Sequence, residues 1–205
     1  MKLFGSPGSP FARKVRIVLA EKHIPCEYMT VRGSAPDSPV PPFNPLAKVP
    51  TLVRDDGRGL YDSPVIVEYL DAIGSGPKLI PEDFASRIEV KRWEALGDGI
   101  TEAAVNINHE YREPPDKQRS LAWFERQQLK IERGLAIMNN ELGTGQYCFG
   151  GRFTLADIAA GYALDYLDYA LPAFEWRKTH PALTRLAERL AARESFRTTM
   201  PPPSA

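Results

Sequence analysis

The stretch MKLFGSPGSPFARKVRIVL (residues 1–19) places a strand and a helix on either side of a Ser-Pro pair. A short apolar start runs into glycine and proline, which predicts a strand over Lys2–Gly5. Apolar residues then recur at helical spacing and predict an amphipathic helix from Pro10 to about His23. These residues are Phe11, Val15, Val18 and Leu19. Serine followed by proline is a preferred helix start, with Ser9 as N-cap and the proline in the first turn.

The alternation of strands and helices continues to about residue 73. Cys26–Val31 is expected to be a second strand, and the proline-rich segment Gly33–Pro45 a long loop. Two short apolar runs flank Asp55–Gly57 and indicate a hairpin. Ser63 and Pro64 then open a second helix. Its apolar face is expected to hold Val65, Ile66, Tyr69, Leu70 and Ile73. The predicted order is therefore βαβ, loop, ββα.

The second half of the chain keeps helical periods throughout. The first two helices are indicated by Trp93, Leu96, Ile100, Ala103, Ile107 and Tyr111, and by Phe124, Ile131, Leu135, Met138 and Leu142. Two more are expected, from Thr154 to about Tyr169 and from Ala182 to about Arg193. Thr154 at N-cap with Asp157 at N3 is a variant of the capping box, worth about 0.5–2 kcal/mol. The sequence predicts a helical bundle here.

The segment Gly74–Asp83 breaks the first pattern and predicts a linker. We place a mixed domain at residues 1–76, a linker at 77–83 and an all-helical domain at 84–205. A length of 205 residues allows two small domains.

Composition excludes several classes of protein. Basic and acidic residues both number 26, so there is no charge surplus to attract nucleic acid or an acidic membrane. No stretch approaches the roughly 20 apolar residues of a membrane span, and the N-terminus does not resemble a signal peptide. Cys26 and Cys148 form no CxxC pair and are expected to be packing residues. Two such cysteines fit a cytoplasmic protein with reduced thiols. The three histidines lack metal-ligand spacing, so we expect no metal site.

Two helix starts and one basic corner form the candidate site. Ser9 and Ser63 each precede a proline at a helix N-terminus, where unpaired N–H groups and a partial positive charge favour anions. A serine there is also an ordinary folding signal, so capping alone would explain it. In the corner Lys48–Pro50, proline stands at the start of a strand. A cis bond there would expose the backbone of Val49 for pairing with an extended ligand, although most such bonds are trans.

Four sequence blocks, SPFARKVRI, NPLAKVPTL, DSPVIVEYL and FTLADI, resemble the cytosolic glutathione S-transferases. They occur in the family's order and span the whole chain. The serine before Pro-Phe resembles that of the Ser-type, bacterial-like members rather than the Tyr-type or Cys-type ones. The resemblance implies an α/β plus all-α fold, with a thioredoxin-like βαβαββα domain followed by an all-helical one. It also implies a homodimer and a role in detoxification.

The resemblance assigns glutathione, as co-substrate, to the corner and the helix starts. Ser9 would donate a hydrogen bond to the glutathione sulfur. Val49, before a cis Pro50, would pair with the cysteinyl unit, and Lys48 would reach the glycyl carboxylate. The γ-glutamyl end would be held by Asp62 and Ser63. The family more often has glutamate where this chain has the shorter Asp62.

The implied activity is conjugation of the glutathione thiolate to small hydrophobic electrophiles. Two alternatives remain open: a non-catalytic binding protein of the same fold, and a glutathione-dependent peroxidase. Phe11, Ile107 and Tyr111 are candidates for the electrophile pocket, although the same residues could belong to the core. Arg13 could add positive charge near the sulfur, but a solvated helix face is the expected place for it.

Overall fold

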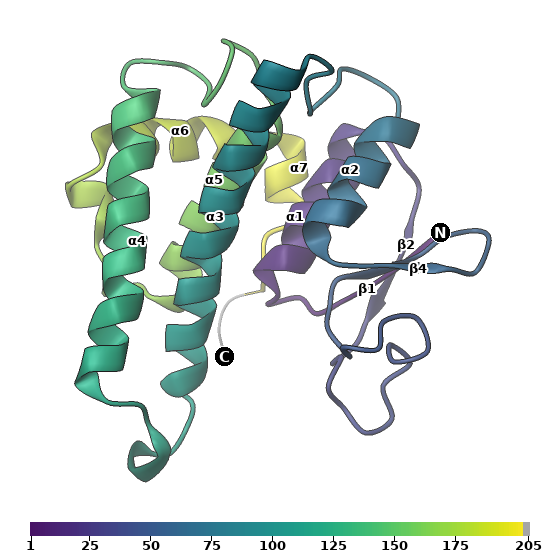
Figure 1. The fold of residues 1–205 in the computed structure, drawn as a ribbon, viewed down its shortest axis with the longest axis horizontal. Helices are drawn as coiled ribbons and strands as arrows, with labels where there is room; N and C mark the ends of the chain where they lie inside the picture. Colours follow the sequence, from purple (N-terminus) through teal and green to yellow (C-terminus); the bar gives the residue numbers. More distant parts are fainter. Residues whose placement is uncertain (203–205) are drawn as a thin grey trace. The chain divides into compact units, whose positions relative to one another are not determined.

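The computed structural model describes residues 1–202 (Figure 1). The chain divides into two compact units, each described here by itself. The first consists of Met1–Ile80 together with the segment that starts at Arg193, and the second of Pro81–Ala192. Within residues 1–202, none of the helices is both long and apolar enough to cross a membrane.

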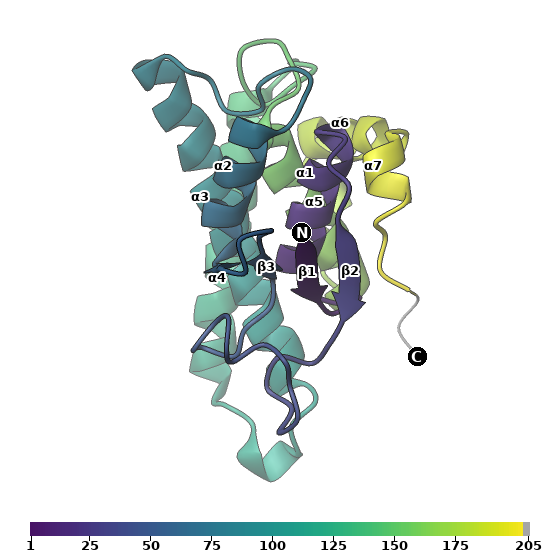
Figure 2. The same cartoon turned by 90° about the vertical axis from the view of Figure 1, so that its right-hand side faces the viewer.

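The first unit is built on a mixed sheet with the strand order β2-β1-β3-β4. The strands are β1 (Lys2–Gly5), β2 (Glu27–Thr30), β3 (Thr51–Val53) and β4 (Gly59–Leu60). β1 pairs with β2 in parallel, whereas the β1–β3 and β3–β4 pairs are antiparallel. Helices α1 (Pro10–Glu21) and α2 (Ser63–Ile73) pack against each other beside the sheet (Figures 1 and 2). This confirms the predicted order βαβ, loop, ββα and the thioredoxin-like fold class.

The middle helix implied by the βαβαββα pattern is absent. Residues 31–50, all described by the structure, contain no helix between β2 and β3. The segment Gly33–Pro45 holds five prolines, each of which lacks an N–H group and restricts the residue before it. It makes a single helix-like turn, in which the N–H groups of Phe43 and Asn44 both donate to the Val40 carbonyl at 2.9 Å.

The buried face of α2 differs from the predicted one. Val65 and Ile73 are 48% and 50% exposed, so their assignment to the buried face was wrong. The buried residues of the helix are Ser63, Ile66, Val67, Leu70 and Asp71. The apolar pattern alone misplaced the buried face of α2, because two of its buried residues, Ser63 and Asp71, are polar.

Asp71 is buried because it completes a polar network at the end of the first unit. Its carboxylate lies 3.1 Å from Lys22 Nζ and accepts the N–H groups of Leu79 and Ile80 at 2.9 and 3.1 Å. Lys22 Nζ also donates to the Pro77 carbonyl at 3.0 Å. Breaking a buried pair of this kind typically costs about 3–5 kcal/mol, since one charge would remain unpaired. The network fixes the first half of the predicted linker onto the helices of the first unit.

The second unit is a helical bundle. Its helices are α3 (Phe84–Glu110), α4 (Leu121–Leu142), α5 (Leu155–Ala170) and α6 (Pro181–Ala191), with short 3₁₀ helices η1 (Pro115–Lys117) and η2 (Trp176–Lys178). α3 packs against both α4 and α5, and α6 packs against the same two helices. Gly97 permits the close approach of α3 to α5, because a Cβ atom there would lie 2.6 Å from the Ala159 carbonyl oxygen.

The capping box at the start of α5 is confirmed. Thr154 Oγ1 accepts the Ala156 N–H at 3.3 Å, and the carboxylate of Asp157 accepts the Thr154 N–H at 2.8 Å. The other oxygen of Asp157 accepts the Cys148 N–H at 2.8 Å. The same side chain therefore stabilises the helix start and the turn before it.

Arg13 is not solvated, and the prediction that it lies on a solvated helix face was wrong. It is 4% exposed. Its Nη2 donates to the Phe196 carbonyl at 3.4 Å and lies 3.0 Å from Met200 Sδ, while its guanidinium carbon is 5.6 Å from the centroid of the Phe196 ring. Arg13 thus holds the C-terminal segment, with its short helix α7 (Glu194–Arg197), against α1.

The other end of α1 is tied to the same segment through Glu21. Arg193 donates to both carboxylate oxygens of Glu21, at 2.9 and 2.7 Å, and the Ser195 hydroxyl donates to one of them. Burial raises the pKa of the Glu21 carboxyl, but these hydrogen bonds outweigh burial, so the pKa lies below its ordinary value. The ionised form is therefore favoured by folding.

Arg193→Met should lower the free energy of unfolding at neutral pH by about 1 kcal/mol, since the pair is partly exposed. Because folding lowers the pKa of Glu21, the stabilisation is present above the unfolded value of about 4.3 and is lost as the pH falls through the folded value. Urea denaturation at neutral and acidic pH measures the difference. Lys178→Met, which breaks an exposed pair with Glu175, is the control and should have little effect. A loss that stays constant down to acidic pH would contradict the assignment.

Candidate functional site

The pairing of β1 with β3 brings the first helix start and the corner to the same end of the sheet. Phe4, near the carboxyl end of β1, is opposite Thr51, the first residue of the antiparallel β3. Pro50 directly precedes Thr51, and Ser9 follows β1 by a short turn. The two positions predicted from separate sequence blocks therefore lie at one edge of the sheet.

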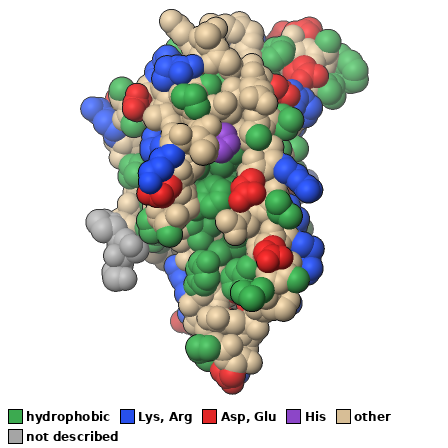
Figure 3. All heavy atoms as spheres, turned by 90° about the vertical axis from the view of Figure 1, so that its left-hand side faces the viewer, with side chains coloured by type: hydrophobic (Ala, Val, Ile, Leu, Met, Phe, Trp, Pro, Cys, Tyr) green, Lys and Arg blue, Asp and Glu red, His purple; other side chains and the backbone are tan. Residues whose placement is uncertain are grey.

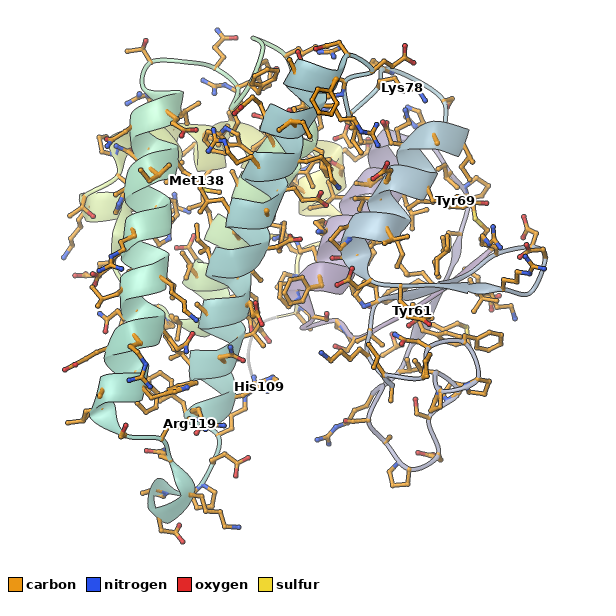
Figure 4. All side chains as sticks on the ribbon, viewed as in Figure 1. Tyr61, Tyr69, Lys78, His109, Arg119 and Met138 are labelled. Carbon is orange, nitrogen blue, oxygen red and sulfur yellow. The ribbon has the colours of Figure 1, made fainter. Side chains whose placement is uncertain are left out.

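The pairing of β3 with β4 adds the second helix start. Leu60, the last residue of β4, is opposite Leu52 in β3, so α2 begins at the same edge. Tyr61, labelled in Figure 4, lies at the junction between β4 and α2 and is followed by Asp62 and Ser63. Two helix N-termini and the corner thus converge on the edge where β1 ends.

Ser9 caps the N-terminus of α1. It is the N-cap of α1, with extended backbone angles, and its Oγ accepts the Ala12 N–H at 3.3 Å. A hydroxyl has one donor and two acceptor lone pairs, so this bond uses acceptor capacity and leaves the proton for another acceptor. Capping and donation to a ligand are therefore compatible in Ser9.

The corner is held by two buried polar side chains that sequence reasoning missed. Asn44 and Thr51 are 1% and 0% exposed. Asn44 Nδ2 donates to the Lys48 carbonyl and to Thr51 Oγ1, both at 3.0 Å, and Thr51 Oγ1 donates to the same carbonyl at 2.8 Å. The amide oxygen of Asn44 accepts the Leu46 N–H at 3.0 Å. The sequence holds one indication of this network. Asn44 stands among prolines in the loop Gly33–Pro45, which is too long to be held by its backbone alone.

The network leaves the outer part of the corner accessible. Lys48 has an exposed side chain, Val49 is half-buried and Pro50 is buried. The backbone N–H and carbonyl of Val49 take part in none of the bonds of the Asn44 network. The Val49–Pro50 peptide bond is cis, as expected, and the Tyr61–Asp62 bond is cis as well.

The second helix start has no side-chain cap. Asp62 is the N-cap of α2 but makes no side-chain capping bond, and its carbonyl accepts the N–H groups of Val65 and Ile66 at 3.1 Å. Ser63, at the first helical position, is 2% exposed. The amide of the first helical residue has no carbonyl to donate to within the helix. The exposed carboxylate of Asp62 and the Ser63 amide therefore stand at a positively polarised helix end.

The chain matches two family models, the glutathione S-transferase N-terminal domain over residues 3–78 and the glutathione S-transferase C-terminal domain over residues 122–189. An uncharacterised GST-like protein of Escherichia coli, YibF, is 39% identical over 98% of this chain and 99% of its own. The chain belongs to the glutathione S-transferase family.

Solved structures of this family are similar along the whole chain. A glutathione S-transferase of Methylobacillus flagellatus with glutathione bound is 45% identical, with a TM-score of 0.94, over 98% of this chain and 99% of its own. One from Methylobacterium radiotolerans in complex with glutathione sulfonate is 40% identical, with a TM-score of 0.93, over 100% and 96%. By sequence alone, a maleylacetoacetate isomerase of Pseudomonas aeruginosa is 28% identical over 98% of this chain and 96% of its own.

The three residues of this chain that were suggested for an electrophile pocket lie in different units. Phe11 is half-buried on α1 in the first unit. Ile107 is 5% exposed in the core of the helical unit, whereas Tyr111 is 63% exposed at the end of α3. The Tyr111 ring stacks on Phe124, with centroids 5.5 Å apart. Burial favours a core role for Ile107, and a pocket role for the three together stays a prediction.

Neither cysteine has the environment of a reactive thiol. Cys26 lies just before β2 and is half-buried, and burial raises its pKa. Cys148 is 8% exposed, and burial followed by the nearby Asp157 carboxylate raises its pKa well above the ordinary value. Both thiols stay protonated at neutral pH, whereas the nucleophilic form is the thiolate. A nucleophilic sulfur in this family member would have to come from glutathione.

Asn44→Ala should weaken glutathione binding, because the corner Lys48–Pro50 would no longer be held in one conformation. The variant removes one of two donors to the Lys48 carbonyl and should lower the free energy of unfolding by about 1–3 kcal/mol. Asn139→Ala is the matched control, because its amide oxygen accepts the Ala182 N–H at 3.0 Å in the helical unit. Urea denaturation gives stability and calorimetry gives the affinity for glutathione. Equal affinities in the two variants would show that the network does not position the corner for binding.

Proposed function

We propose that this protein is a glutathione transferase that conjugates the glutathione thiolate to small hydrophobic electrophiles. The observation that carries the proposal is the convergence of Ser9, the Lys48–Pro50 corner and the α2 start at one edge of the sheet. Glutathione and glutathione sulfonate bound in similar solved structures support the choice of ligand.

The chemistry of glutathione fits the groups at this edge. Its γ-glutamyl carboxylate suits the Ser63 hydroxyl and amide at the start of α2, where the helix favours an anion. The exposed carboxylate of Asp62 suits the ligand amine. The free backbone of Val49 suits the cysteinyl unit, as an extended peptide pairs with the edge of a strand. Lys48, exposed beside it, suits the glycyl carboxylate. Each end of the tripeptide then has a partner of opposite charge.

Activation of the thiol is assigned to Ser9. A free thiol has a pKa of about 8.5, so only a small fraction is thiolate at neutral pH. The Ser9 proton, left unused by its capping bond, can be donated to the sulfur, and the N-terminus of α1 adds a partial positive charge. Both favour the thiolate, and each unit by which the pKa falls corresponds to about 1.4 kcal/mol. Serine stabilises the nucleophile and holds it in place; the sulfur attacks the electrophile.

Two other activities share the same bound thiolate. A peroxidase would direct it at a peroxide, and the similarity to a maleylacetoacetate isomerase makes glutathione-dependent isomerisation a further option. A panel that contains an aryl halide, an organic peroxide and a cis-dienoic acid separates the three. Conjugation of the aryl halide as the fastest reaction supports the proposal, and turnover of none of them by a protein that binds glutathione supports the binding-protein alternative.

Ser9→Ala should reduce turnover while leaving glutathione affinity nearly unchanged, because the two ends of the peptide are held elsewhere. Losing a hydrogen bond to a charged group costs about 1.5–3 kcal/mol, which corresponds to a fall of roughly one to two powers of ten in rate. The titration of the bound thiol, followed by its ultraviolet absorbance, should move to higher pH. Ser9→Thr keeps the cap and the donor and should restore most of the activity.

The lost cap contributes about 1 kcal/mol by itself, so melting is measured in parallel. Unchanged turnover in a stable Ser9→Ala protein would limit Ser9 to its capping role and assign the thiolate to another donor, such as the side chain of Ser6.

The protein should be a homodimer in solution. Large apolar side chains are exposed on the helical unit, among them Phe84 at 78% and Leu121 at 80%. Figure 3 shows hydrophobic side chains gathered between charged ones on the face where α4 lies. Such surfaces commonly mark contacts with another chain. Light scattering should give twice the mass of 22.9 kDa, and the mass of a single chain would refute the dimer.

A further inference from the structure

A cavity lies in the first unit, away from the edge that carries Ser9. Its volume is about 460 Å³, within the roughly 300–1,000 Å³ typical of small-molecule sites. It is lined by the later turns of α1, the amino ends of β1 and β2, and Thr198 and Thr199 of the C-terminal segment; these elements face the viewer in Figure 2. Ser9 and Ala20 are about 16 Å apart along the helix, at 1.5 Å per residue. The cavity is therefore separate from the proposed glutathione site.

One wall of the cavity is aliphatic. Leu3 of β1 and Leu19 of α1 line it but are 0% and 8% exposed, so its accessible apolar surface comes mainly from Ile24 and Pro25, in the turn that leads into β2. Removing apolar surface from water is the main source of affinity in a site of this kind. The wall thus suits the apolar body of a ligand of modest size.

The charge of the cavity comes from Arg16. Its Nη1 and Nη2 donate to the carbonyls of Thr199 and Thr198, both at 3.2 Å, and its guanidinium carbon lies 4.8 Å from the centroid of the Tyr28 ring. These contacts fix the guanidinium in one orientation. A guanidinium has five N–H donors, so the two carbonyl bonds leave donor capacity for a further acceptor.

The remaining lining carries no opposing charge. Among the described residues around the cavity none is Asp or Glu, and His23 is the other titratable base. A single fixed cation beside an aliphatic wall matches one negative charge on an apolar body. The planar fork of arginine matches a carboxylate in particular, through two parallel hydrogen bonds.

We propose that this cavity binds a small hydrophobic monocarboxylic acid, aromatic or aliphatic, with its carboxylate on Arg16 and its apolar body against Leu19 and Ile24. The site is independent of Ser9 and of the proposed transfer reaction. Occupation would place a ligand between α1 and the C-terminal segment.

Cys26 provides a direct readout, because its half-buried thiol lines the cavity. The probe is 1-naphthoate, and the measurement is the rate at which a disulfide reagent labels Cys26, with the site identified by mass spectrometry. At ten times its dissociation constant the probe should slow labelling about tenfold, by mass action. Cys148, which is 8% exposed in the other unit, is the internal control and should be unaffected. The neutral analogue 1-naphthamide should protect Cys26 far less. The experiment is run without glutathione, whose own thiol would consume the disulfide reagent, so its result does not depend on the transfer activity.

Two variants test the geometry. Arg16→Gln should weaken 1-naphthoate about tenfold to a hundredfold, as expected for a lost hydrogen bond to a charged group. Ala20→Phe fills the cavity from an exposed helix position, leaves Arg16 and its carbonyl bonds in place, and should abolish protection without lowering the melting temperature. If Arg16→Gln unfolds, the proposal is still tested by Ala20→Phe and by the comparison of naphthoate with naphthamide. No protection at millimolar naphthoate, equal protection by naphthamide, or protection that survives Ala20→Phe would overturn the proposal.

Discussion

The antiparallel pairing of β3 with β1 is the constraint on which the candidate site depends. It sets Thr51 opposite Phe4 and so places the corner at the end of β1, where α1 begins. The strands concerned are short, β3 with three residues and β4 with two, so few ladder bonds hold them. The buried Asn44 and Thr51 add side-chain bonds to the Lys48 carbonyl and compensate for this. Because a buried polar group without a partner is costly, such a network favours one arrangement of the corner.

Helix α1 connects this edge to the rest of the first unit. Ser9 starts it, Arg13 and Arg16 bind carbonyls of the C-terminal segment along its length, and Glu21 closes its far end with Arg193. A basic helix would otherwise be expected to face solvent. Here carbonyl groups of α7 and of the two residues after it provide the acceptors that make burial of guanidinium groups acceptable. The position of Ser9 is thereby fixed at the sheet and also by residues almost the whole chain length away.

Features encoded within a few residues were predictable from the sequence. The strand Lys2–Gly5, the cap at Ser9 and the capping box at Thr154 are each indicated by neighbouring residues in the sequence, and all three are found in the structure. The features that were missed depend on distant partners. Arg13 is buried by Phe196, 183 residues away, and Asp71 by the amides that follow the second helix. Periodicity cannot anticipate a polar residue that is buried because of its partners. The resemblance to the family likewise implied a middle helix that five local prolines prevent.

The candidate residues for glutathione and for the electrophile differ in how strongly the fold constrains them. Those for glutathione are helix starts and a strand-edge backbone, whose donors and acceptors have fixed directions and positions set by strand register. Those for the electrophile are apolar side chains such as Phe11 and Tyr111, and apolar contact is non-directional. Tyr111 also stacks on Phe124, so this exposed side chain has a packing role whether or not it contacts a ligand. Replacing such a side chain changes the shape of a pocket without moving a strand or a helix start. In the proposed function, specificity for glutathione is therefore tied to the fold, while specificity for an electrophile is free to vary upon it.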